Sequence, residues 1–263
     1  MAAPDRERDR ALEQLIVRDG ARLLAFARRS CGDGSDAEDI VQETLVRAVR
    51  SWHQLADPLH ARAWLYAIAR RVCQRLHRRR AGEPRRLEPL AELLPRPRAT
   101  VPDLVAAAPD DPHRDRLRSE ARELVERAVA RLPDRFRQAL VLADVAELTV
   151  AEIAAVTGVA EATVKTRLHR ARLKLRAALA EGLPQRAAPA RGHARRVCLD
   201  LLQAKLEAMD RRAPFPYSDA ALCERCRTVL STLDLAGATC AAFANEPLPP
   251  GLAGRIRAAV ADA

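Results

Sequence analysis

A cluster of prolines divides the chain into parts that are otherwise rich in helix-forming residues. Seven of the 17 prolines fall between Gly82 and Pro112. Proline removes a backbone hydrogen-bond donor and breaks helices, so this stretch of about 30 residues is predicted to be a linker. Compact domains seldom need a connection of that length. We therefore expect separate helical modules, with the linker disordered by itself or laid along a partner.

The composition predicts an all-α protein. Aromatic residues make up 3% of the 263 residues, whereas Ala, Leu and Arg are abundant and runs of β-branched residues are missing. Before the linker, Val41, Leu45, Ala48 and Trp52 form an apolar stripe at helical spacing. A second breaker segment, EGLPQRAAPARG at residues 181–192, precedes a third module that runs to the end. Helices packed on helices are the expected architecture.

Two basic segments indicate a polyanionic partner. The chain has 45 Lys and Arg against 35 Asp and Glu, a net charge of +10. Residues 70–86 hold eight Arg and one acid, and residues 165–176 hold six Lys or Arg and no acid. The alternative is that the two segments are solvated helix faces, although such faces usually carry charges of both signs. We expect two contact regions for nucleic acid.

The chain shows no sign of export. Its start, MAAPDRERDR, lacks the apolar core of a signal peptide, and no window approaches an uninterrupted membrane span. A cytoplasmic protein without membrane contact is expected. In a reducing compartment the six cysteines are better interpreted as buried residues, metal ligands or redox thiols than as a disulfide framework. Cys31 and Cys73, each alone in its context, are expected to be buried.

The segment LTVAEIAAVTGV, residues 148–159, predicts the first half of a helix-turn-helix. Thr149 can cap a short helix with Glu152 as its capping-box partner. Gly158 supplies the positive φ that a tight turn requires. A longer helix follows, and in this arrangement the second helix enters the major groove of DNA.

That second helix is predicted to combine an apolar stripe with many cations. Val164, Leu168, Ala171 and Leu175 form one narrow stripe, so the other sides are expected to face DNA. If about four of its six cations reach phosphates, log affinity should fall with log salt at a slope near −3.6. A basic solvated helix is the alternative. The predicted DNA contacts here are Thr163, Lys165, Thr166, Arg167, His169, Arg170, Arg172 and Lys174, with Arg176 also on the exposed sides.

Three motifs together resemble the extracytoplasmic-function (group IV) sigma factors of bacterial RNA polymerase. They are GDGSDAEDIVQETLVRAVRSW, HARAWLYAIARRVCQRLHRRR and LPDRFRQALVLADVAELTVAEIAAVTGVAEATVKTRLHRARLKLRAAL. The resemblance implies sigma region 2 over residues 10–80, a linker over 81–117 and sigma region 4 over 118–182. RNA polymerase core enzyme and promoter DNA are the implied partners, and a separate anti-sigma factor is a further one. The linker would thread toward the polymerase active-site cleft.

The same resemblance implies roles for residues of the first module. The helix that spans residues 36–52 would grip the polymerase clamp, and the basic helix over 62–80 would recognise and open the −10 element. Aromatic side chains such as Trp64 can stack on unpaired bases, although a core position is the alternative. The polymerase-binding candidates are Asp36, Glu38, Asp39, Gln42 and Glu43, and the DNA-binding candidates here are Trp64, Arg70, Arg71, Arg75 and Arg78.

Residues 191–263 form an additional, cysteine-containing extension. Cys223 and Cys226 form a CxxC, and Cys198 lies on a preceding amphipathic helix. Three thiolates suit zinc or another thiophilic metal, with His193, Asp219 or Cys240 as the fourth ligand. The segment resembles the zinc-binding domain of anti-sigma factors, which carries His where this chain has Asp219. A redox thiol pair and ordinary buried cysteines remain alternatives. The extension is expected to be a regulatory module.

Two other classes of function fit the sequence less well. A helix-turn-helix regulator that does not act as a sigma factor would not need the block at residues 35–52. A zinc enzyme built on the extension lacks support, because the sequence contains no HExxH, no paired carboxylates near the cysteines and no glycine-rich phosphate loop. We therefore expect a protein that is not an enzyme.

Overall fold

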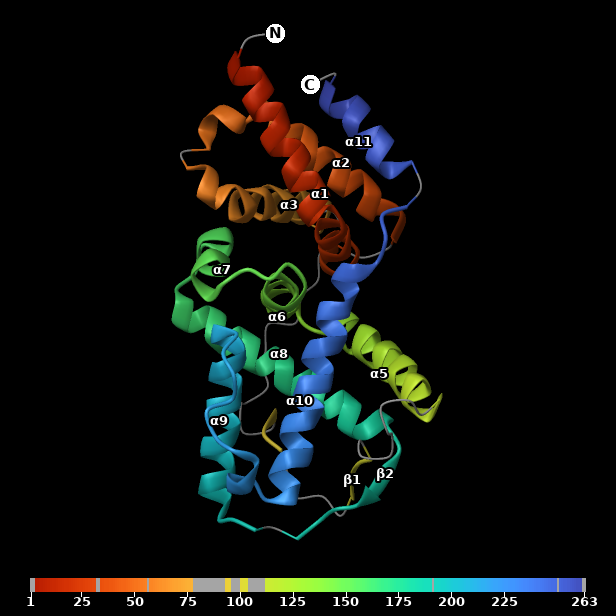
Figure 1. The fold of residues 1–263 in the computed structure, drawn as a ribbon, viewed down its shortest axis with the longest axis vertical. Helices are drawn as coiled ribbons and strands as arrows, with labels where there is room; N and C mark the ends of the chain where they lie inside the picture. Colours follow the sequence, from red (N-terminus) through yellow and green to blue (C-terminus); the bar gives the residue numbers. More distant parts are fainter. Residues whose placement is uncertain are drawn as a thin grey trace. The chain divides into compact units, whose positions relative to one another are not determined.

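The fold is described from a computed structural model that covers residues 3–31, 34–55, 57–77, 93–95, 100–103, 112–190, 192–249 and 251–261. The expected all-α class is confirmed, with one short two-stranded sheet among the described residues (Figure 1). The chain forms two compact units. The first contains residues 1–83, 141–161 and 242–263, and the second contains residues 84–140 and 162–241.

Three long helices form the centre of the first unit. They are α1 (Ala3–Cys31), α2 (Gly34–Arg50) and α3 (Ala61–His77), with short 3-10 turns η1 (Trp52–Gln54) and η2 (Pro58–His60) between the last two. Each packs on the other two. The predicted stripe is buried at Val41, Leu45 and Ala48, and Phe26 of α1 meets Tyr66 of α3 edge to face, with ring centroids 5.5 Å apart.

A disulfide joins α1 to α3. Cys31 and Cys73 are bonded, with Cα atoms 5.3 Å apart, a normal separation for a disulfide. Both residues are buried as expected, but the expectation that the cysteines do not form disulfides is wrong for this pair. The sequence gives no sign of the pairing because 42 residues separate the two cysteines and only the packing of α1 on α3 brings them together.

The first unit also contains residues from the second half of the chain. A π-helical turn, η4 (Val141–Val145), packs on α1, and α7 (Val150–Thr157) packs on α3. After α10, the turn η6 (Phe243–Asn245) packs on α1 and α11 (Leu252–Ala261) packs on α2. Arg29 of α1 lies over the ring of Phe243 at 3.6 Å and donates a hydrogen bond to Glu246 at 2.7 Å.

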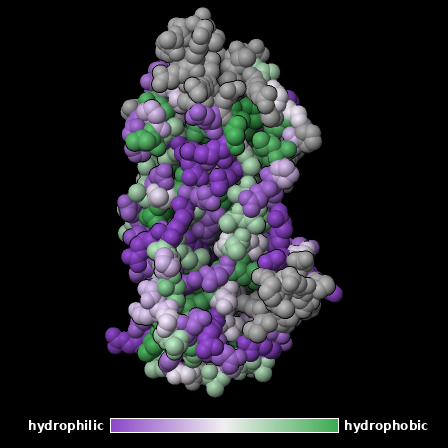
Figure 2. Space-filling view, viewed as in Figure 1, coloured by the Kyte–Doolittle hydropathy of each residue, from purple (hydrophilic) through white to green (hydrophobic). Residues whose placement is uncertain are grey.

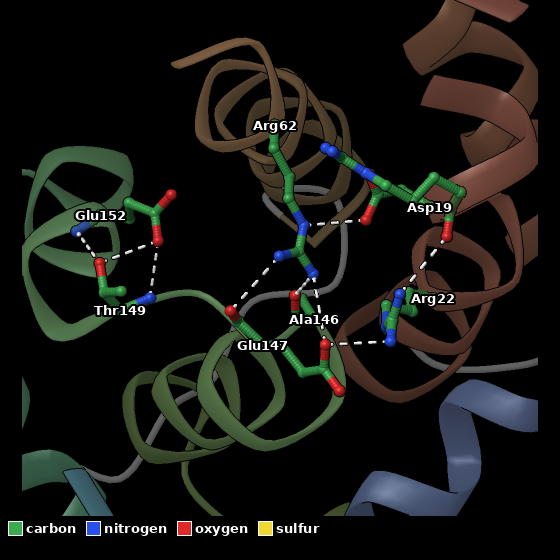
Figure 3. Close-up of polar contacts among 8 residues, drawn as sticks. Asp19, Arg22, Arg62, Ala146, Glu147, Thr149 and Glu152 are labelled. Carbon is green, nitrogen blue, oxygen red and sulfur yellow. Dashed lines mark hydrogen bonds and ion pairs between the residues drawn. The ribbon is translucent and has the colours of Figure 1, made fainter. Parts of the chain in front are cut away.

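Arg62 connects these segments inside the first unit (Figure 3). Its Nε donates to the carboxylate of Asp19 at 2.8 Å, and its guanidinium also donates to the backbone carbonyls of Ala146 and Glu147. Asp19 is fully buried. Glu147 has a positive φ of 54° and pairs with Arg22 at 2.9 Å. A buried charge needs such partners, so this network fixes the segment between η4 and α7.

The second unit is built from α5 (Pro112–Ala130), α6 (Asp134–Leu140) and α8 (Glu161–Gly182), followed by α9 (Arg195–Arg211) and α10 (Glu224–Ala242). Helix α5 begins before residue 118, where the resemblance places the start of region 4. The short turn η5 (Asp219–Ala221) precedes α10. In Figure 1, α9 and α10 run side by side, and Lys205 of α9 pairs with Asp234 of α10 at 2.6 Å.

Part of the predicted linker has a defined place in this unit. Strand β1 (Thr100–Pro102) pairs antiparallel with β2 (Gln185–Ala187), with Val101 opposite Arg186. Leu93 belongs to the apolar cluster of α8, α9 and α10. Residues 78–92, which include Arg78, lie outside the described residues.

The surface fits the burial of apolar stripes. On the face seen in Figure 2, hydrophilic residues (purple) alternate with hydrophobic areas (green). Within the described part of the chain, we find no helix that combines the length and the apolar composition needed to cross a membrane.

Candidate nucleic-acid interface and thiol site

The predicted helix-turn-helix has its local features in place. Thr149 Oγ1 accepts from the backbone N–H of Glu152, and the Glu152 carboxylate accepts from the backbone N–H of Thr149 at 2.7 Å (Figure 3). This reciprocal capping box starts α7. Gly158 ends it with φ of 70°, in the left-handed region. Helix α8 then begins at Glu161.

Helix α8 buries the predicted stripe. Val164, Leu168, Ala171 and Leu175 are each at most 1% exposed. Near the start of the helix, Thr163, Lys165 and Thr166 are exposed, and Thr166 Oγ1 donates to the Ala162 carbonyl at 2.9 Å. Arg167, Arg170 and Lys174 are half-buried. The first turns of α8 therefore present polar and basic groups to solvent, as a helix that enters a DNA groove requires.

Two predicted DNA contacts are instead held by an acid of the extension. Arg172 is 3% exposed and its guanidinium donates to the carboxylate of Asp210, a residue of α9. His169 Nε2 lies 3.0 Å from the other oxygen of the same carboxylate. The Asp210 side chain is itself 2% exposed. In this state Arg172 does not face solvent, which corrects the expectation that it lies on an exposed side.

The single-stripe expectation for α8 is also wrong. Leu173 is 1% exposed, although it lies about 140° around the helix from Leu168 at 100° per residue. It packs in an apolar cluster whose other buried members are Leu93, Leu201, Leu202, Leu206, Leu222, Cys226, Leu230 and Leu233. Most of that cluster belongs to α9 and α10. Helix α8 is therefore buried on a second side, by the extension.

Three of the candidates of α2, Asp36, Asp39 and Glu43, lie on the opposite side of the helix from its core residues. Asp39 is exposed, while Asp36 and Gln42 are half-buried. Glu43 forms an ion pair with Arg47 on the same helix. Glu38 pairs with Arg255 of α11, a contact that the sequence did not predict. The pairing joins residues 217 positions apart, and only the packing of α11 on α2 reveals it.

The candidates of α3 fall into two environments. Arg71 and Arg75 are exposed, and Arg75 Nε donates to the Arg71 carbonyl at 3.3 Å. Arg70 is half-buried, as is Trp64, whose ring meets Trp52 edge to face at 6.0 Å. Trp64 is thus partly exposed and also packed against another ring. Arg78 lies outside the described residues.

The extension brings three cysteines together at one end of the α9 and α10 pair. The sulfur atoms of Cys198, Cys223 and Cys226 all lie within 4.8 Å of one another. Thiolates that share a zinc ion at about 2.3 Å are about 3.8 Å apart in a tetrahedron. Gly192 approaches closely as well, because a Cβ there would lie 2.7 Å from Cys223 Cβ. The three soft donors fit a thiophilic cation.

The three thiols differ in acidity. Burial opposes ionisation of Cys223, but hydrogen bonds from backbone amides, including those of Cys226 and Gly192, outweigh it and lower its pKa. Burial, together with the neighbouring sulfurs of Cys198 and Cys223, raises the pKa of Cys226. The cluster therefore favours a thiolate at Cys223, stabilised by neighbouring hydrogen-bond donors. The thiolate is the form of cysteine that binds metals and reacts with oxidants.

The candidates for a fourth ligand are not equivalent. Cys240 lies on the same helix as Cys226, 14 residues further along, which corresponds to about 21 Å. It cannot share an ion with that residue, so this expectation is corrected. His193 is better placed, since its Nε2 lies 3.2 Å from the carbonyl of Ala221, two residues before the CxxC. Asp219 is exposed in η5.

Comparisons with known proteins give a consistent family. Residues 15–83 match the family model described as Sigma-70 region 2, and residues 122–175 match Sigma-70, region 4. The chain is 35% identical over 162 residues to the ECF RNA polymerase sigma factor SigL of Mycobacterium tuberculosis, which covers 61% of this chain and 84% of that protein. It is 33% identical over 171 residues to SigE of Mycolicibacterium smegmatis, another ECF RNA polymerase sigma factor, covering 64% of this chain and 62% of SigE.

A solved structure is also similar. It is the sigma factor RpoE in complex with the anti-sigma factor NepR from Bartonella quintana, at 24% identity with a TM-score of 0.44, covering 64% of this chain and 94% of that chain. At that score the likeness adds nothing to the assignment.

The helical modules and the sequence matches define the class of the protein as a sigma factor of the Sigma-70 type. More narrowly, the chain belongs to the ECF RNA polymerase sigma factor family. The region 4 match ends at residue 175, so the α9 and α10 pair lies beyond both family matches.

Proposed function

We propose that this protein directs promoter-specific transcription initiation by joining RNA polymerase core enzyme. The helix-turn-helix of α7 and α8 carries this proposal, because its capping box, positive-φ glycine and basic second helix occur within a match to region 4. Helix α8 would contact the upstream, −35 element through Thr163, Lys165 and their neighbours. A helix-turn-helix regulator of another kind would not explain the match to region 2.

The first unit would supply the polymerase and downstream contacts. The acidic side of α2, with Asp36, Asp39 and Gln42, suits a basic surface of the polymerase clamp. The exposed Arg71 and Arg75 of α3 suit the phosphates of the −10 element. The half-buried Trp64 would stack on an unpaired base.

Run-off transcription tests the proposal. Core polymerase with the full-length protein is expected to give 5′ ends on genomic DNA that share two spaced upstream elements. Lys165→Glu, on the exposed start of α8, should remove most of these starts. Arg131→Glu, an equal charge change at an exposed residue outside α8, should leave them. Starts no more frequent than with core polymerase alone would contradict the sigma function.

We infer further that the extension binds a thiophilic metal, of which zinc is the first to test. Cys198, Cys223 and Cys226 would hold the ion, and His193 would rotate from the Ala221 carbonyl to complete the site or leave a position to water. When bound, such an ion would cross-link the start of α9 to the start of α10. The proximity of the three sulfur atoms supports this proposal.

Metal content after dialysis against zinc tests the site without reference to transcription. The full-length protein should retain about one zinc ion per chain. The double variant Cys223→Ser, Cys226→Ser should retain none, whereas Cys240→Ser, a buried cysteine of the same helix, should retain the ion. A wild-type protein without zinc, with Cys223 and Cys226 instead recovered as a disulfide after mild oxidation, would favour the redox alternative.

A further inference from the structure

The side of α8 that the extension covers is a basic side. Around the helix, Arg172 and His169 lie between the apolar stripe and Leu173, at about 80° and 140° from Val164. Arg176 is next to them, at about 120° from the same reference. A helix that binds DNA needs its cations free on the side away from its own domain. Here α9 and α10 lie over part of that side.

Asp210 presents an anionic group to the basic side of α8. Its two carboxylate oxygens contact two different basic side chains of α8, Arg172 through a guanidinium nitrogen and His169 at 3.0 Å. Charge-assisted hydrogen bonds of this kind are about twice as strong as neutral ones. Because the Asp210 side chain and Arg172 are almost fully buried, little solvent screens the pair.

We propose that α9 is an intramolecular competitor of DNA, in which the Asp210 carboxylate occupies Arg172 and His169 of the recognition helix and thereby holds the protein in a state of low DNA affinity. The inference rests on the proposed role of α8 in promoter binding. In this proposal the extension binds the covered side of α8, and the Asp210 carboxylate makes the main electrostatic contact.

An apolar contact accompanies the Asp210 contact. Leu173 packs in one cluster with leucines of α9 and α10, and these two helices also contact each other through the Lys205 and Asp234 ion pair. The pair of helices can therefore remain intact when it leaves α8. The cysteine cluster does not form the Asp210 contact, since Cys198 and Asp210 are 12 residues apart on α9, about 18 Å.

DNA affinity of the full-length protein tests the proposal. The probe is a fluorescein-labelled duplex of mixed sequence, followed by anisotropy, so that no promoter needs to be known. Asp210→Asn keeps the shape of the side chain and removes its charge. We expect roughly tenfold tighter binding, because the fraction of molecules competent to bind rises. The slope of log affinity against log salt should become steeper by about 0.9 for each cation released.

Asp200→Asn is the matched control. Asp200 is an exposed acid on the same helix, and its substitution makes the same change in net charge. The affinity of the Asp200→Asn variant for the duplex should stay within about twofold of wild type, as expected for an exposed charge about 15 Å along α9 from Asp210. Equal affinities for Asp210→Asn and Asp200→Asn would overturn the proposal.

Hydrogen exchange on the wild-type protein provides a measurement that does not depend on how the variant folds. Saturating duplex DNA should reduce the protection of the α9 amides, because DNA displaces α9. Unchanged or increased protection of α9 would overturn the proposal. Neither measurement uses polymerase. A failure of run-off transcription would thus remove the sigma function alone, and a failure here would remove the competitor alone.

Discussion

At the scale of single residues, two of the buried polar groups, Tyr66 and Asp19, differ in whether they have hydrogen-bond partners. Tyr66 is fully buried, and burial raises the pKa of its phenol, so the group stays neutral. Among the described residues its hydroxyl has no hydrogen-bond partner. Asp19 is equally buried but has two partners, Arg18 at 2.9 Å and Arg62 at 2.8 Å. Substitution should therefore have opposite effects at the two positions.

Tyr66→Phe is expected to stabilise the protein by about 1 kcal/mol. The substitution removes a hydroxyl that is desolvated without compensation and keeps the edge-to-face contact with Phe26. Thermal unfolding followed by circular dichroism measures the change. A lower melting temperature than that of wild type would show that the hydroxyl has a partner that stabilises the fold.

Asp19→Ala is expected to reduce the free energy of unfolding by about 3 kcal/mol. Removal of one member of a buried ion pair leaves the other, Arg62, with only the longer ion pair to Glu147, at 3.9 Å. Urea denaturation gives the size of the loss. Asp39→Ala removes an exposed carboxylate and should change stability by less than about 0.5 kcal/mol. Losses of similar size for the two variants would refute the assigned role of Asp19.

At the scale of secondary-structure elements, the helices themselves follow from the local sequence, whereas the contacts between helices do not. The period of Val164, Leu168, Ala171 and Leu175 is enough to predict α8, and Thr149 with Glu152 is enough to predict where α7 begins. The disulfide between α1 and α3 could not be predicted, because cysteine spacing carries no information about which helices pack together.

That disulfide should be a major source of stability for the first unit. A bridge that closes a loop of 42 residues restricts the unfolded chain, by up to about 4 kcal/mol in the chain-entropy model. Dithiothreitol should therefore lower the melting temperature of the wild-type protein. The double variant Cys31→Ser, Cys73→Ser should melt at the lower temperature with or without the reductant. If the wild-type protein melted identically in both conditions, the bridge would contribute nothing to stability.

At the scale of the whole molecule, the net positive charge favours DNA binding, whereas the covering of α8 by the extension opposes it. The net charge of +10 attracts DNA, while the extension removes cations of α8 from solvent. A count from the sequence alone, with four phosphate contacts from α8, leads to a salt slope near −3.6. With Arg172 held by Asp210, three contacts give a slope nearer −2.7.

Anisotropy titrations of full-length protein with duplex DNA at 50 to 300 mM KCl are expected to give the shallower slope. The reason is that each phosphate contact releases about 0.9 of a counterion, and one contact of α8 is replaced by an internal one. A measured slope of −3.6 or steeper would mean that Arg172 reaches the DNA while the extension is in place.

The sequence by itself determined the helical class, the helix-turn-helix, the separation of the basic segments and the grouping of Cys223 with Cys226. These are local properties, set by periodicity, capping and short spacing along one helix. Only the tertiary structure decided that Cys31 bonds to Cys73, that Arg62 meets Asp19, that Cys240 is too far from the other thiols, and that Asp210 covers Arg172. In the three pairs Cys31–Cys73, Arg62–Asp19 and Asp210–Arg172, the partners lie 38 to 43 residues apart along the chain. A contact over that sequence distance depends on which helix faces pack together, and no single segment contains that information.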